Sequence, residues 1–161
     1  MAEIQPTRRL ILATDFDDTS VEAVEWTVAN LLQNGDEVHL VHAVQDDGII
    51  DPDFSDMGVV AVNDAEQQRA IRAAELNAKQ WADTLENEIL PPKRVKVVPH
   101  AFIGAPGPLI VEKAETLDCD FIVVGTHRRG LLSELVLGSV SNYCLTHSKK
   151  PVLIVSQHKG Q

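Results

Sequence analysis

The sequence has few cysteines and no long hydrophobic run, and each shortage excludes a class of protein. Its two cysteines, Cys119 and Cys144, are too few for a disulfide framework, so we expect both to be small buried hydrophobic residues. No apolar run approaches the roughly 20 residues that cross a bilayer. The opening residues, MAEIQPTRRL, contain no apolar signal core, so we expect a cytoplasmic protein without a membrane partner.

Positive charge is also scarce. Lysine and arginine total 14 against 24 aspartates and glutamates, which gives a formal net charge of −10. A chain without a broad basic face is a poor match for a nucleic-acid backbone, so we expect no nucleic-acid partner. Two adjacent cations, Arg128 and Arg129, lie beside glycines. This local reversal of charge favours a small anionic ligand.

Length and composition predict one domain. At 161 residues, of which 44% are hydrophobic, the chain is long enough to bury a substantial core. We expect a single domain over 1–161, with its core at about 8–156. Residues 45–62 contain five aspartates, two glycines and a proline, and we interpret them as a flexible, solvated loop because the aspartates match no calcium-loop spacing.

Apolar runs alternate with segments of helical periodicity. Strands are predicted at 9–14, 38–44, 94–102, 121–124 and 151–155, with Pro99 placing the third at a sheet edge. Helices are predicted to end near residues 33, 89, 117 and 147. This order predicts an α/β fold, a single Rossmann-like domain with a five-stranded parallel sheet and four helices on both faces.

Two histidines in the second predicted strand suggest a metal site only at first sight. His39 and His42 are an odd number of positions apart, so their side chains point to opposite faces of the strand. We expect each to be exposed or hydrogen-bonded to the backbone, and no shared metal site.

The stretch from Phe121 to Asn142 has the pattern of an anion-binding site. A buried strand breaks at Gly125 into a polar turn, and after a short apolar segment, Gly138 and Ser139 begin a helix. Free N–H groups at a helix start and the helix dipole attract phosphate, and glycine allows close backbone approach. If the first and fourth strands are neighbours, Asp15 and Gly125 end side by side in one crevice.

These residues support a family resemblance. The spaced pattern G-x2-G-x9-G-[S/T], its continuation GSVSNY, the opening ILATDFDDTS, the strand VHLVHAV and the ending PVLIV resemble the ATP-binding branch of the universal stress protein family. The resemblance covers essentially the whole chain. It implies the adenine nucleotide alpha hydrolase-like fold, a role in the stress response, a bound ATP or AMP with or without Mg²⁺, and a homodimer through Pro151–Val155.

The resemblance also implies which residues bind the nucleotide. Gly125, Gly138 and Ser139 match the motif for the phosphates and ribose, and Asp15 matches an acid near the adenine. The strand backbone at Ala43 would contact the base, and Gly104 lies in a loop near the ribose. The complete predicted set, with the rest of the glycine loop and the first helical turn, is Asp15, Ala43, Gly104, Gly125, His127, Arg128, Gly138, Ser139, Val140 and Ser141.

One motif position departs from the family pattern, because Arg128 stands where the second glycine belongs. Either the arginine blocks the ligand or strains the backbone by about 1 kcal/mol, or it donates a charge-assisted hydrogen bond to phosphate. Three hypotheses therefore stay open: a nucleotide-loaded regulatory module, a slow ATP hydrolase, and a nucleotide-free dimeric adaptor or chaperone-like protein. No catalytic residue is predicted, since the lysine of GxxxxGK[ST] is absent.

Overall fold

Five parallel strands form one sheet in the order β3-β2-β1-β4-β5. The computed structural model describes residues 7–15, 18–44, 64–89, 94–126 and 137–156. The elements alternate as predicted: β1 (Arg9–Ala13), α1 (Asp18–Asn30), β2 (Glu37–Val44), α2 (Asp64–Thr84) with a π-helical turn η2 (Leu85–Ile89), β3 (Lys96–Ile103), α3 (Pro106–Thr116), β4 (Phe121–Gly125), α4 (Ser139–His147) and β5 (Val152–Val155). The predicted α/β class and five-stranded parallel sheet are confirmed.

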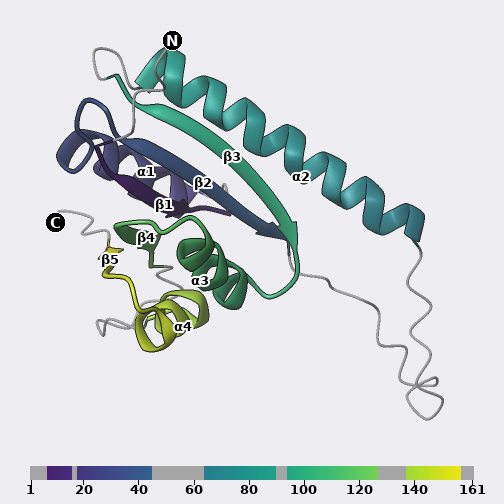
Figure 1. The fold of residues 1–161 in the computed structure, drawn as a ribbon. Coiled ribbons are helices and arrows are strands. Elements are labelled where there is room, and N and C mark those ends of the chain that lie inside the picture. The colour runs from purple at the N-terminus through teal and green to yellow at the C-terminus, as the bar shows by residue number, and fades with distance from the viewer. Residues whose placement is uncertain (1–6, 16–17, 45–63, 90–93, 127–136, 157–161) are drawn as a thin grey trace, which may run out of the picture.

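Helices cover both faces of this sheet (Figure 1). Side chains along β1 alternate between the two layers: Leu10 and Leu12 join a core with α1 and α2, whereas Ile11 joins a core with α3 and α4. These three side chains are almost completely buried. Full burial of each contributes about 1.5–3 kcal/mol. Because these side chains pack against helices on both faces, the sheet holds the helices, and with them the helix ends, in place.

The first helix ends earlier than its sequence pattern predicts. We expected it to continue to about residue 33, but the N–H groups of Leu31 and Leu32 both donate to the carbonyl of Thr27. Gly35 then adopts a φ of +89°, and its N–H donates to the carbonyl of Arg94 in the chain leading to β3. The left-handed conformation of Gly35, whose N–H is hydrogen-bonded to the segment before β3, turns the chain away from the helix.

Other boundaries differ by one or two residues. The third strand was expected at 94–102 and lies at Lys96–Ile103, and it occupies a sheet edge as Pro99 predicted. The expected loop at 45–62 and the glycine-loop segment at 127–136 lie outside the described residues.

Both cysteines are buried free thiols, as predicted. Burial raises the pKa of Cys144 to about 11 and also raises that of Cys119. In the described part of the chain, no helix combines the length and apolar character needed to span a membrane.

Candidate functional site

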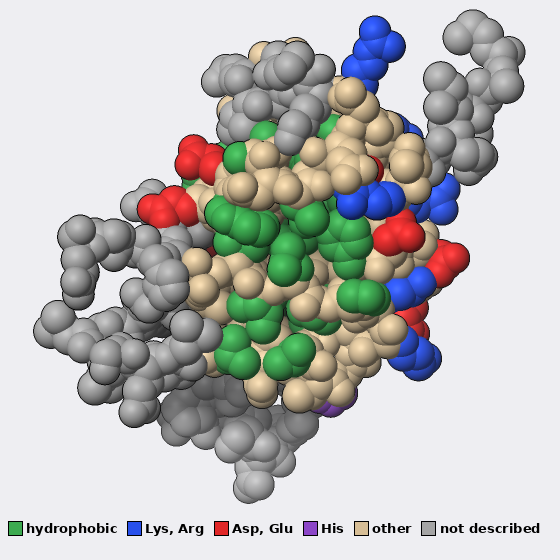
Figure 2. Space-filling view, turned by 90° about the vertical axis from the view of Figure 1, so that its left-hand side faces the viewer, with side chains coloured by type: hydrophobic (Ala, Val, Ile, Leu, Met, Phe, Trp, Pro, Cys, Tyr) green, Lys and Arg blue, Asp and Glu red, His purple; other side chains and the backbone are tan. Residues whose placement is uncertain are grey.

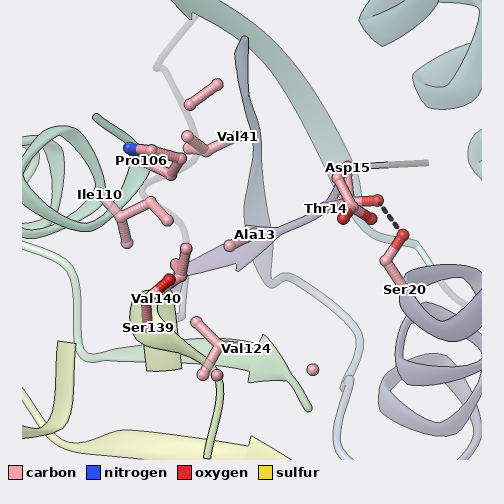
Figure 3. A pocket seen from close by; sticks show the side chains of 13 residues that line it. Ala13, Thr14, Asp15, Ser20, Val41, Pro106, Ile110, Val124, Ser139 and Val140 are labelled. Carbon is pink, nitrogen blue, oxygen red and sulfur yellow. Dashed lines mark hydrogen bonds between the residues drawn. The ribbon is translucent and has the colours of Figure 1, made fainter. Parts of the chain in front are cut away.

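A cavity of about 460 Å³ opens at the carboxyl ends of β1 and β4 (Figure 3). The chain winds from β1 outward through β2 to β3, then returns to the other side of β1 with β4, so these two strands flank the reversal point. Open parallel sheets bind ligands at this position. Ile11 pairs with Ile122 and Leu12 with Val123. Continuing that register brings the end of β1 beside Gly125. The first and fourth strands are therefore neighbours, which was the condition under which we predicted that Asp15 and Gly125 share one crevice.

The cavity has an apolar side and a polar side. Pro106, Ile110 and Val41 gather on one side, and Thr14, Asp15 and Ser20 lie opposite (Figure 3). The complete described lining is Ala13, Thr14, Asp15, Ser20, Val41, Ala43, Pro106, Ile110, Val124, Gly125, Gly138, Ser139 and Val140. A pocket of this size with an apolar wall and a few convergent polar groups is typical of a small-molecule site.

The N-terminus of α4 contributes backbone donors to this cavity. Gly138 is the N-cap, and within the described ranges no side-chain hydrogen bond caps the helix. The N–H of Asn142 is the first to bond within the helix, to the carbonyl of Gly138 at 2.9 Å. The preceding N–H groups, those of residues 139–141, therefore have no intrahelical acceptor. Since Ser139 and Val140 line the cavity, the positive end of the helix dipole meets it.

Gly138 has open space where a side chain would begin. Its φ of −62° is ordinary for any residue, so the glycine is not required by backbone conformation. Among the described residues, a Cβ placed there would have only Ser141 Oγ within contact distance, at 3.8 Å. The Cβ would instead occupy space beside the helix amides that a ligand needs.

The polar side is held by contacts between β1, α1 and β2. Thr14 donates through its hydroxyl to Ser20 Oγ at 2.9 Å, and its N–H donates to the carbonyl of Val41 at 3.0 Å. His42 Nδ1 lies 3.0 Å from the carbonyl of Thr14, so the ring donates from that nitrogen. This backbone bond agrees with the prediction for His42. It fixes the backbone immediately before the exposed Asp15.

The prediction for His39 was wrong. Its ring is buried and bonds to side chains: Nδ1 lies 2.8 Å from Nε2 of His100, and Nε2 lies 3.0 Å from Oε1 of Glu37. The register of β2 and β3 causes this. Val98 is the partner of His39, and His100 follows two residues later on the same face of the sheet.

The structure brings together six of the ten predicted site residues. Asp15, Ala43, Gly125, Gly138, Ser139 and Val140 line the cavity. Gly104 and Ser141 are not among its lining residues: Gly104 follows β3 with a φ of +137°, and the buried Ser141 donates through Oγ to the carbonyl of Gly138. His127 and Arg128 lie outside the described residues.

The apolar side was missed by sequence reasoning. Val41 had a usable signal, because it lies two residues before Ala43 and therefore on the same face of β2. Pro106 and Ile110 had none, since their contribution depends on where α3 packs.

The described part of the cavity lining carries little charge. Asp15 alone among these residues has an ionisable side chain, so the described groups that attract an anion are backbone amides. No group of three or more histidine, cysteine, aspartate or glutamate side chains suited to a metal ion occurs in the described ranges.

Comparisons with known proteins give a consistent result. The sequence model of the universal stress protein family matches residues 6–156. Universal stress protein MJ0577 of Methanocaldococcus jannaschii is 27% identical over 154 residues, covering 93% of this chain and 95% of that protein. A solved structure of MJ0577 superposes with a TM-score of 0.68 at 26% identity, covering 98% of this chain and 100% of that one.

Two further solved structures share the fold and carry bound nucleotides. One is a universal stress protein family protein from Arabidopsis thaliana with AMP bound, at a TM-score of 0.57 and 19% identity, covering 94% of this chain and 93% of that one. The other is a universal stress protein in complex with cAMP, at a TM-score of 0.51 and 22% identity, covering 92% of this chain and 96% of that one.

Proposed function

Because this chain belongs to the universal stress protein family, we propose that it is a dimeric regulatory module of the stress response that binds an adenine nucleotide in the cavity at β1 and β4. The observation that carries the proposal is the start of α4, where uncapped amides meet a cavity at the reversal point of the sheet. The AMP and cAMP in two structures of the same fold support the adenine nucleotide as the ligand class.

The two sides of the cavity suit the two ends of such a ligand. The amides of Ser139 and Val140 would donate to phosphate oxygens, and the apolar side at Val41 and Ile110 would contact the base. ATP and AMP share these parts, so both are candidates. Mg²⁺, where present, would be held by phosphate oxygens, because the described lining offers one carboxylate, that of Asp15.

Gly138→Ala tests nucleotide binding without disturbing the fold. The added methyl makes no close contact with the described residues but fills the approach to the amides. We expect calorimetric titration with AMP and ATP to show affinity reduced about tenfold or more, since losing one charge-assisted hydrogen bond costs about 1.5–3 kcal/mol. We expect the unfolding midpoint to change little.

Asn142→Ala is the matched control. Asn142 is exposed and lies on the same helix but outside the cavity lining. Both variants therefore introduce alanine into α4, but only Gly138→Ala places it where a ligand is expected. Equal affinity of Gly138→Ala and wild type would refute phosphate binding at these amides. Failure of wild-type protein to bind any adenylate would favour the nucleotide-free adaptor instead.

The two edges of the sheet differ, and this difference supports a homodimer through β5. On β3, Lys96 and Gly104 donate N–H groups inward, so residues 97, 99, 101 and 103 present their backbone outward. The outward N–H of Val97 donates to Glu86 Oε1 at 2.9 Å, and Pro99 has no N–H. Half of this edge therefore cannot donate to another strand.

The β5 edge has no such protection within the described residues. The carbonyls of Pro151 and Val155 accept hydrogen bonds from β4, so Val152 and Ile154 present their N–H and C=O groups outward. An antiparallel pair centred on Leu153 would join Val152 of one copy to Ile154 of the other in both directions. Figure 2 faces the β5 side of the molecule and shows hydrophobic side chains gathered at its centre.

Light scattering after size exclusion tests this interface. We expect a dimer from wild type and a monomer from the double variant Val152→Asp, Ile154→Asp. Ile154→Pro is a second probe, because it removes an outward donor while leaving the bonds to β4 in place. Pro99→Asp places a charge on the opposite edge as a control, and it should leave the dimer intact. Loss of the dimer in that control but not in the β5 variants would place the interface at β3.

A further inference from the structure

The pair formed by His39 and His100 lies beside the cavity, because the strand partner of His100 is the cavity residue Val41, and the two rings share a hydrogen bond. The two nitrogens are 2.8 Å apart, while the ring centres are 5.1 Å apart and the planes differ by 25°. The nitrogen atoms at the ring edges therefore make the contact, as in a hydrogen bond. Only one proton fits between two nitrogens at this distance.

Neighbouring groups fix where the protons lie. Glu37 can only accept, so Nε2 of His39 carries a hydrogen and, in the neutral ring, Nδ1 is bare. His100 then donates from Nε2 to that nitrogen. One added proton reverses this bond: His100 passes its Nε2 proton to Nδ1 of His39 and takes the added proton on its own Nδ1, so the His39 imidazolium now donates to His100 Nε2. A second added proton sets two N–H groups against each other and breaks the contact.

Charged groups on β1, β2, β3, α2 and α3 lie around the pair, and those of α2 are Glu75 and Lys79, which line a second cavity together with His100. Glu37 on β2 favours a protonated His39, but Glu37 also pairs with Lys96 on β3 at 2.9 Å and with Arg9 on β1 at 3.4 Å. Lys113 on α3 acts against protonation of both rings. Burial, the largest cause, lowers the pKa of His39 and lowers that of His100 to about 4.

The pair is physically continuous with the apolar side of the cavity. The ring of His100 stacks on Phe102, whose strand partner is the cavity residue Ala43. The ammonium of Lys113 lies 5.5 Å from the centre of the same Phe102 ring. Lys113 follows Ile110 of the cavity by three residues, so both lie on one side of α3.

We propose that His39 and His100 form a proton switch beside the nucleotide cavity: protonation of both rings breaks the His39–His100 contact, repels Lys113 from Phe102 and lowers nucleotide affinity. This inference rests on the proposed function. The added charge displaces Lys113 and Phe102. Ala43 pairs with Phe102 across the strands, and Ile110 lies on the same side of α3 as Lys113, so we expect both cavity residues to move with them.

The test is the pH dependence of AMP affinity between pH 7.5 and 4.0, a range that includes the lowered pKa of His100, measured by calorimetry on wild type, His39→Gln and His100→Gln. Glutamine retains a side-chain amide for hydrogen bonding but does not titrate. We expect wild type to lose about fivefold more affinity over this range than either variant. Comparing proteins with one ligand cancels the titration of the phosphate itself. His147→Gln, which alters an exposed histidine at the far end of α4, should behave as wild type.

Histidine proton resonances of the free protein provide a readout that needs no nucleotide. We expect His39 and His100 to titrate together below the usual range, and His39→Gln to shift the titration of His100. Strong AMP binding with the same pH dependence in all four proteins would overturn the switch alone. No AMP binding at pH 7.5 would overturn the proposed function and the coupling together, and independent titration of the two rings would refute the shared proton.

Discussion

Gly107→Ala should loosen the contact between α3 and α4. Gly107 is buried in the first turn of α3. A Cβ at this position would lie 2.8 Å from both Cβ and Cγ of Tyr143 and 2.9 Å from its Cδ1. Carbon atoms in favourable contact are about 3.5–4.0 Å apart. The helices must therefore separate or the tyrosine must leave its position.

The net magnitude combines opposing effects. Overpacking of this kind costs about 1–3 kcal/mol, while replacing glycine with alanine in a helix returns about 0.5–1 kcal/mol. We expect the free energy of unfolding to fall by about 1–2 kcal/mol, and the midpoint by about 2–8 °C for a chain of this size. Urea titration and calorimetry measure both quantities.

The contact also affects the site, because α3 supplies Pro106 and Ile110 to the cavity and α4 supplies Ser139 and Val140. Gly107→Ala should therefore weaken AMP binding. Tyr143→Ala in the same chain should relieve part of the clash, since it removes Cγ and Cδ1 but keeps Cβ. Unchanged or increased stability in Gly107→Ala, with no coupling to Tyr143→Ala, would refute tight packing of these helices.

Three further predictions concern groups away from the cavity. Asp36→Ala should lower the free energy of unfolding by about 2–4 kcal/mol in urea titrations, because the buried carboxylate accepts two hydrogen bonds from Arg8 at 3.0 and 2.6 Å; a loss below 0.5 kcal/mol, roughly the size of a neutral surface change, would contradict this. The pKa of His100 is about 4 in the fold against about 6.5 unfolded, so unfolding binds protons and stability should fall as pH drops from about 6.5 towards 4. The loss is at most about 3 kcal/mol and is reduced by solvent screening; His100→Gln should flatten the profile, and an equal slope would count against a low pKa. The buried thiols of Cys119 and Cys144, with raised pKa values, should react with Ellman's reagent at pH 8 only as fast as the protein opens, and immediate reaction of the folded protein would show that they are accessible.

Most of the fold could be predicted because its signals are local. Apolar runs such as 9–13 and 121–124 are long enough to identify buried strands, and Pro99 alone places its strand at an edge. The sequence did not predict that β1 and β4 are neighbours, and we could only assume it, because strand order depends on how the crossover helices pack. Once that order is known, Asp15 and Gly125 reach the same cavity without further information.

The site was less predictable because part of its lining is brought there only by the packing of helices. Gly138, Ser139 and Val140 have a local signal in a helix start, whereas Ile110 reaches the cavity only through the position of α3. The His39–His100 contact spans 61 residues of sequence and depends on the register of β2 and β3. Periodicity within β2 correctly separates His39 from His42, but it contains no information about the neighbouring strand.

The two edges of the sheet also differ in a way that the sequence reveals only in part, and this difference bears on the proposed dimer. Pro99 is visible in the sequence and removes one outward donor from β3. The second protection, Glu86 accepting from the N–H of Val97, requires η2 to end beside that strand. Hydrophobic character does not separate the edges, since both strands are largely apolar. What favours β5 as the dimer interface is that its outward backbone groups, at Val152 and Ile154, have no comparable cap among the described residues, so a second β5 strand would satisfy them.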